Sequence, residues 1–132
     1  MYGLAGVVSQ GVDGYTRSRQ TIERGETVKV YAIDFDNTLF KTTYPTIISP
    51  MWRTIRRVKR LQDKGHKIIL NTCRVEPWLS EAVEACRQVG LEFDAVNANL
   101  PERIAQYGGD CRKISADIYI DDKNKFWRGV NW

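Results

Sequence analysis

The fold is constrained above all by residues 28–39, which read VKVYAIDFDNTL. An apolar run rich in β-branched and aromatic residues that ends in a carboxylate is typical of a buried strand in the middle of a sheet. Asp34 and Asp36 lie two residues apart, so an extended backbone points both side chains to the same face. Two carboxylates so close are costly unless a cation or a proton lies between them. A solvated strand end is the alternative, and the apolar run before the pair disfavours it.

Strand and helix patterns alternate along the rest of the chain. Such alternation predicts one α/β domain with a mostly parallel sheet, in which the first and fourth strands are adjacent. In an open sheet of this kind ligands bind at the carboxyl ends of the strands. After the first strand, the predicted elements are strands at 66–72, 91–97 and 113–122 and helices at 50–64, 76–89 and 101–107.

Caps and glycines set the expected ends of these helices. Ser49 is the expected N-cap of the first helix, with Pro50 in its first turn. A glycine follows each helix and is expected to stop it: Gly65, Gly90 and Gly108. The first helix carries an apolar stripe that predicts its buried face: Met51, Trp52, Ile55, Val58 and Leu61.

The two ends of the chain carry weaker patterns. Residues 1–27 predict an irregular N-terminal extension, with 4–8 as a candidate short strand and a basic nucleic-acid-binding arm as the alternative. The folded domain is expected to span 28–132. Three aromatic residues near the end are expected to cover an edge of the core: Phe126, Trp127 and Trp132.

Composition narrows the class of protein. The chain has 132 residues, which suffices for one domain with a core but leaves little room for a second. No run of about 20 apolar residues and no basic, apolar leader is present, so we expect neither a membrane span nor a secretory signal. Three cysteines without a Cys-x-x-Cys pair predict a reducing cytoplasm rather than disulfides or zinc. The net charge of +4 permits an anionic partner.

Four features occur in a fixed order: Asp34-x-Asp36-x-Thr38, then Thr72 after a strand, then Lys113, and then two adjacent acids at 121–122. This order resembles the four-motif signature of the haloacid dehalogenase (HAD) phosphatases, and the last region is similar to the deoxyribonucleotidase branch. The resemblance implies a HAD-like Rossmannoid three-layer sandwich with a hairpin flap after the first strand. Since the gaps between motifs hold only core elements, no cap domain is expected.

The resemblance also implies roles for the acids. Asp34 would attack phosphorus and form an aspartyl-phosphate. Asp36 would protonate the leaving oxygen and later accept a proton from water, for which its pKa should be raised. Mg²⁺ would be held by Asp34, by Asp122 and by the backbone carbonyl of Asp36. Asp121 would bind the metal directly or through water.

The resemblance assigns the remaining site residues by position. Thr72 would donate its hydroxyl to the phosphoryl group, and Lys113 would neutralise that group. Arg74 is a further candidate for substrate binding, and Thr38 is expected to fix the turn. Cys73 is expected to be a packing residue, because no histidine base accompanies it.

The sequence therefore predicts a Mg²⁺-dependent phosphomonoester hydrolase acting on a phosphorylated small molecule, with a nucleotide as one candidate. Two alternatives remain open: a phosphatase for nucleic-acid ends or phosphoproteins, and a non-catalytic module with the same fold. One helix face could attract nucleic acid, although a solvated face is the simpler interpretation. That face comprises Arg53, Arg56, Arg57, Arg60 and Lys64.

Overall fold

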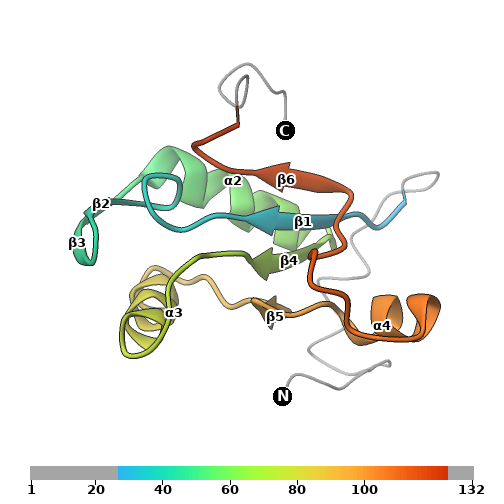
Figure 1. The fold of residues 1–132 in the computed structure, drawn as a ribbon. Coiled ribbons are helices and arrows are strands. Elements are labelled where there is room, and N and C mark those ends of the chain that lie inside the picture. Colours follow the sequence, from blue (N-terminus) through green and yellow to red (C-terminus); the bar gives the residue numbers. More distant parts are fainter. Residues whose placement is uncertain (1–26, 125–132) are drawn as a thin grey trace.

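The computed structural model describes residues 27–124, and Figure 1 labels its elements. The predicted N-terminal extension and the aromatic residues Phe126, Trp127 and Trp132 lie outside the described residues, apart from residue 27. The elements are β1 (Val30–Ile33), β2 (Phe40–Thr43), β3 (Thr46–Pro50), α2 (Trp52–Asp63), β4 (Lys67–Leu70), α3 (Trp78–Gln88), β5 (Ala95–Val96), α4 (Pro101–Tyr107) and β6 (Ile118–Ile120).

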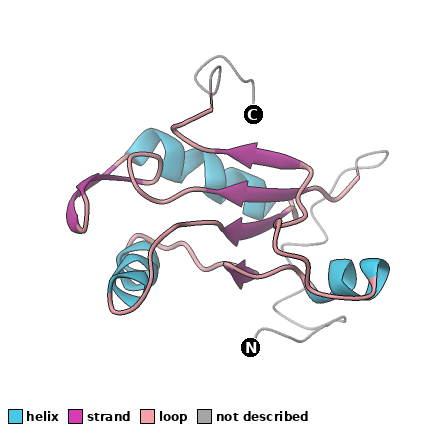
Figure 2. Cartoon of the chain, viewed as in Figure 1, coloured by secondary structure: helices cyan, strands magenta, loops and turns pink. Residues whose placement is uncertain are grey.

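Four parallel strands form the central sheet in the order β5-β4-β1-β6 (Figure 2). β1 lies inside the sheet, and all four of its residues are buried. Burial on both faces explains why its sequence is a continuous apolar run rather than an alternating one. The structure thus confirms the predicted parallel sheet and the pairing of the first strand with the last.

The α/β fold is layered: helices α2 and α3 pack on one face of the sheet, and loop residues just before α4 and before β6 cover the other. On one face Tyr31 and Ile33 pack with buried residues of α2 and α3, such as Val58 and Cys86. On the opposite face Val30 joins a smaller cluster: Ile69, Ala95 and Leu100, with Ala98, Ile114 and Ala116 packed against them. The alternation of side chains along β1 therefore supplies both cores.

A two-stranded antiparallel hairpin, β2–β3, lies between β1 and α2. It begins beyond the carboxyl end of β1, as the flap implied by the HAD resemblance should. Within residues 27–124 this hairpin is the whole of the insertion between β1 and α2, so that gap holds no cap domain.

Two strands are shorter than predicted, and side chains bond backbone N–H groups where the regular strand pairing stops. The predicted strand at 91–97 is paired only at β5, and the Asp94 carboxylate accepts a hydrogen bond from the Ile68 N–H at 2.8 Å. The predicted strand at 113–122 is paired only at β6. Before β6, the Asn99 side chain accepts a hydrogen bond from the Ser115 N–H at 2.6 Å, and the segment is loop.

The start of α2 differs from its prediction. Met51 is the N-cap and no side chain caps the helix, while Pro50 ends β3 instead of opening α2. Trp52 is 48% exposed, and Thr54 is buried in the helix face instead. The predicted stops are correct: Gly65, Gly90 and Gly108 all have positive φ. No helix within residues 27–124 combines the length and the apolar character that a membrane span needs.

Candidate active site

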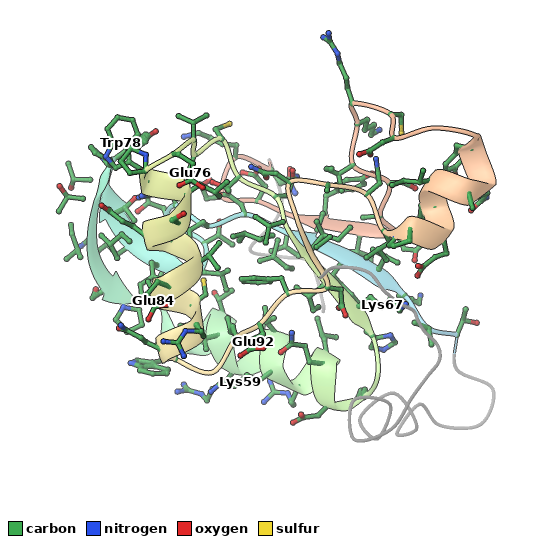
Figure 3. The ribbon with its side chains drawn as sticks, turned by 90° about the horizontal axis from the view of Figure 1, so that it is seen from below. Lys59, Lys67, Glu76, Trp78, Glu84 and Glu92 are labelled. Atoms are coloured by element: carbon green, nitrogen blue, oxygen red, sulfur yellow. The ribbon has the colours of Figure 1, made fainter. Side chains whose placement is uncertain are left out.

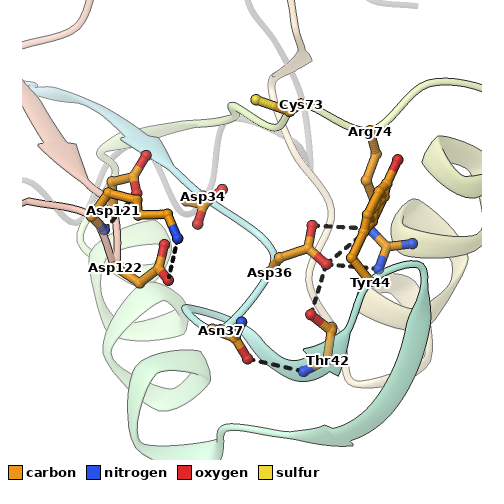
Figure 4. A pocket seen from close by; sticks show the side chains of 10 residues that line it. Asp34, Asp36, Asn37, Thr42, Tyr44, Cys73, Arg74, Asp121 and Asp122 are labelled. Atoms are coloured by element: carbon orange, nitrogen blue, oxygen red, sulfur yellow. Dashed lines mark hydrogen bonds and ion pairs between the residues drawn. The ribbon is translucent and has the colours of Figure 1, made fainter.

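The carboxyl ends of β1 and β6 bring the predicted acids together. Asp34 follows β1 directly and its N–H donates to the Ile120 carbonyl at 2.9 Å, while Asp121 and Asp122 follow β6. Carboxylate oxygens of Asp34, Asp121 and Asp122 lie within 4.8 Å of one another. Figure 4 places Asp121 and Asp122 on one side of the pocket and Arg74 on the other, with Asp34 between them.

A buried threonine ties the two strand ends to each other. The Thr38 hydroxyl donates to Asp34 Oδ2 at 3.1 Å and accepts from the Asp122 N–H at 3.0 Å. Thr38 itself is fully buried. It therefore fixes the spacing of Asp34 and Asp122, which matches its predicted role in the turn rather than in substrate binding.

The environment of Asp34 disfavours its charge. Burial, the nearby charge of Asp121 and a hydrogen bond with Asp122 together raise the pKa of Asp34 to about 7, against a smaller opposing effect of Thr38. Three carboxylates this close repel one another. A cation among them would remove that cause and favour the ionised form.

Asp36 points away from the other acids and pairs with Arg74. Arg74 Nη2 donates to Asp36 Oδ1 at 2.8 Å, Arg74 Nε donates to Asp36 Oδ2 at 3.0 Å, and the Thr42 hydroxyl donates to Oδ1 at 2.8 Å. Burial raises the pKa of Asp36, but these hydrogen bonds and the arginine charge outweigh it and lower the pKa overall. The prediction that the pKa of Asp36 is raised is therefore wrong.

Arg74 is an anchor rather than a free cation. Its side chain is 1% exposed. Besides Asp36, its guanidinium donates to the Trp78 carbonyl at 3.3 Å and to the Pro45 carbonyl at 3.0 Å. It therefore joins the loop after β1, the hairpin and the start of α3. The expectation that Arg74 binds substrate stays a prediction: Arg74 lines the pocket, but most of its N–H donors already bond within the protein.

These residues surround a pocket of about 280 Å³. Two predicted site residues do not line it. Thr72 accepts a hydrogen bond from the Arg74 N–H at 3.1 Å, and the exposed Lys113 lies 5.7 Å from the centre of the Tyr119 ring. The lining consists of Asp34, Asp36, Asn37, Thr42, Tyr44, Cys73, Arg74, Asp121, Asp122 and Lys123.

Five of the lining residues were not predicted as site residues: Asn37, Thr42, Tyr44, Cys73 and Lys123. Lys123 Nζ lies 4.0 Å from Asp122 Oδ2, so this lysine, and not Lys113, is near the acids. Its position directly after the strand-end acids is the signal that could have identified it. Cys73 was expected to pack inside, yet it is exposed and lines the pocket.

Comparison with known proteins gives one informative match. It is a solved structure of a conserved protein from Bacteroides thetaiotaomicron, 38% identical in sequence, with a TM-score of 0.67; the match covers 75% of this chain and 79% of that one. This chain belongs to the same family. No protein-family model and no curated protein matches the chain. The related protein is described only as conserved, so this match assigns a family and indicates no chemistry.

The three clustered acids of this chain could bind a hard divalent cation. The cluster of Asp34, Asp121 and Asp122 contains oxygen donors only. Mg²⁺ prefers such oxygens, whereas zinc sites are built mainly from histidine and cysteine. Among residues 27–124 no other group of this kind was found. The donor set is thus one that Mg²⁺ could bind, and the magnesium site itself stays a prediction.

Proposed function

We propose that this chain is a Mg²⁺-dependent phosphomonoester hydrolase of the HAD type that works through an aspartyl-phosphate on Asp34. The observation that carries the proposal is the meeting of Asp34, Asp121 and Asp122 at the carboxyl ends of two adjacent parallel strands. Phosphoryl transfer depends mainly on an in-line geometry and on neutralising the charge of the phosphoryl oxygens. A rigid strand end that carries a nucleophile and metal ligands meets both needs.

The reaction has two steps on this site. In the first, an oxygen of Asp34 bonds to phosphorus, the bond from phosphorus to the alcohol oxygen breaks, and that oxygen takes the proton of the protonated Asp36 carboxyl. In the second, water attacks the same phosphorus, gives its proton to Asp36, and releases inorganic phosphate with Asp34 restored. The hydroxyl of Thr38 keeps Asp34 oriented throughout.

Asp34, Asp122 and the backbone carbonyl of Asp36 would hold Mg²⁺, with Asp121 as a direct or water-mediated ligand. When bound, the ion supplies positive charge beside the transferred phosphoryl oxygens. Asp122 is held by Thr38 through its N–H, and Asp121 Oδ1 accepts the Lys123 N–H at 2.8 Å. One carboxylate oxygen of Asp121 is therefore already engaged in a hydrogen bond within its own turn.

The Asp36–Arg74 pair fits the second step better than the first. It favours the ionised carboxylate, which is the form that accepts a proton from water. Protonating the leaving oxygen requires the other form, so Asp36 must loosen from Arg74 when it acts as the acid.

Lys123 takes the place proposed for Lys113 as the cation near the phosphoryl group. It lines the pocket and approaches Asp122, whereas Lys113 does neither. Replacing Lys123 by alanine should raise the KM for a phosphomonoester, and the matched change Lys113→Ala should not. An increase with Lys113→Ala alone would return the role to Lys113.

The substrate is proposed to be a phosphorylated small molecule, with nucleotides included. The gap after β1 holds a hairpin rather than a cap, so the pocket is reachable from solvent. The proposal also includes a cytoplasmic location, which is supported by three cysteines that are all free.

Hydrolysis of p-nitrophenyl phosphate tests the proposal. We expect turnover with Mg²⁺, none with EDTA, and none in Asp34→Asn. Glu81→Gln changes an exposed carboxylate on α3 outside the pocket and serves as the matched control. Equal turnover in EDTA, or activity of Asp34→Asn within about tenfold of wild type (roughly 1.4 kcal/mol of barrier), would refute the mechanism.

A further inference from the structure

Two large aromatic side chains lie exposed beside the pocket. Tyr44, in the turn of the hairpin, is 50% exposed, and Trp78, the first residue of α3, is 37% exposed. Their rings meet edge to face, with centroids 5.9 Å apart. Tyr44 lines the pocket, and Figure 3 shows Trp78 at the end of α3 that lies beside the hairpin. We call these two residues the aromatic rim.

The aromatic rim is fixed by the same arginine that holds Asp36. The Arg74 guanidinium lies 5.2 Å from the centre of the Tyr44 ring and donates to the Trp78 carbonyl. It also bonds the Pro45 carbonyl next to Tyr44. The buried Arg74 thus contacts the Tyr44 ring, the Trp78 backbone and the Asp36 carboxylate, so it links the rim to Asp36. Exposed aromatic rings beside a polar pocket are suited to binding another ring.

Pocket size and lining indicate what the rim would bind. About 280 Å³ is at or below the small end of ligand pockets, so a substrate larger than its phosphate and a short linker extends over the rim. Apart from Tyr44, the lining is mainly carboxylate, amide, hydroxyl and cationic groups. Tyr44 belongs to the lining and contacts the exposed Trp78, so the rim extends from the pocket toward solvent. A ring joined to the phosphate through a sugar extends further out of the polar pocket than one bonded directly to the phosphate oxygen.

We propose that the aromatic rim of Tyr44 and Trp78 is a subsite that stacks with the base of a nucleoside monophosphate. This inference rests on the proposed phosphatase function and narrows its substrate class. The phosphate occupies the acidic pocket, the sugar crosses the polar lining, and the base packs against the rim. Stacking of this kind is tolerant of base identity, since every base has a π face.

The experiment compares AMP with ribose 5-phosphate, which lacks the base, and with phosphotyrosine, which has its ring on the phosphate oxygen. Wild type should hydrolyse AMP with a kcat/KM about tenfold or more above both. Tyr44→Leu and Trp78→Leu keep apolar bulk but remove the rings, and each should lose most of that preference. Trp52→Leu removes another exposed tryptophan, at the start of α2, and should keep it.

Each outcome decides one of the two proposals. If ribose 5-phosphate or phosphotyrosine is used as well as AMP, or if the preference survives in both rim variants, the subsite is wrong while the hydrolase stands. If no substrate turns over, the hydrolase proposal fails, and calorimetry with AMP and ribose 5-phosphate then tests the rim alone. Tighter binding of AMP that Tyr44→Leu and Trp78→Leu abolish would support the subsite. Equal binding of the two compounds would overturn it.

Discussion

Replacing Asp34 by asparagine should stabilise the metal-free protein, although it removes the proposed nucleophile. Asp34 shares its site with two further carboxylates, and their repulsion is relieved only by a proton or a cation. Asparagine keeps an oxygen for the Thr38 hydroxyl and adds two N–H donors that the neighbouring carboxylates can accept. The variant therefore removes a charge and keeps an acceptor for the Thr38 hydroxyl.

The size and the pH window of this effect follow from the raised pKa. Raising the pKa of Asp34 from 3.8 to about 7 means that the folded state binds more protons than the unfolded state between these values. The free energy of unfolding of wild type should fall as pH rises through that window, and the loss is complete above it. Converting the whole rise in the pKa of Asp34 into free energy gives about 4 kcal/mol. Because Asp34 is partly exposed, screening should reduce this to about 1–2 kcal/mol.

Urea denaturation in EDTA at about pH 5 and about pH 8 measures the effect. Asp34→Asn should be more stable than wild type by about 1–2 kcal/mol at the higher pH and by less at the lower. Excess Mg²⁺ should stabilise wild type at the higher pH and the variant much less. Glu81→Gln, with its exposed side chain, should show neither change. A wild type that is as stable as Asp34→Asn at the higher pH in EDTA would refute the reasoning.

Further predictions concern the metal, the arginine and the basic helix. Asp122→Ala should weaken Mg²⁺ affinity more than Asp121→Ala in calorimetry; equal losses would make the two acids equivalent ligands. Arg74→Met should cost about 3 kcal/mol of unfolding free energy at neutral pH, because Asp36 loses its partner. Since its pairing lowers the pKa of Asp36, that cost should shrink as pH falls below about 4; a constant cost would indicate packing alone. If the basic face of α2 binds nucleic acid, oligonucleotide affinity should fall steeply with salt, and less steeply in a triple alanine variant; an unchanged slope would leave a solvated face. The triple variant changes Arg53, Arg56 and Arg60, which are exposed, and spares the half-buried Arg57.

The acid cluster could be predicted because strong local patterns fix it. The apolar run of β1 can only be buried, and parallel strands place their carboxyl ends at one edge, so the acids after β1 and β6 had to be neighbours. Glycines that stop helices are similarly local signals. These parts of the fold follow from patterns within a few residues of each other.

The parts that failed depend on contacts between distant segments. Lys113 was assigned to the site through the resemblance to the HAD motif order, yet it lies in a segment before β6 where side chains such as Asn99 bond the backbone. Burial of Arg74 needs the Asp36 carboxylate and carbonyls from the hairpin and α3 at once. No pattern within a single segment encodes such a set, so the lowered pKa of Asp36 could not be anticipated.

The central claim is that Asp34 carries the phosphoryl group, and trapping that group tests it most directly. The Asp36→Asn protein, mixed with p-nitrophenyl phosphate and Mg²⁺ and quenched in acid, should accumulate one phosphoryl group that peptide mass spectrometry locates on Asp34. The double variant Asp34→Asn/Asp36→Asn should accumulate none. Phosphate found on another residue, or turnover at the wild-type rate with no phosphorylated Asp34 at any time, would contradict the mechanism.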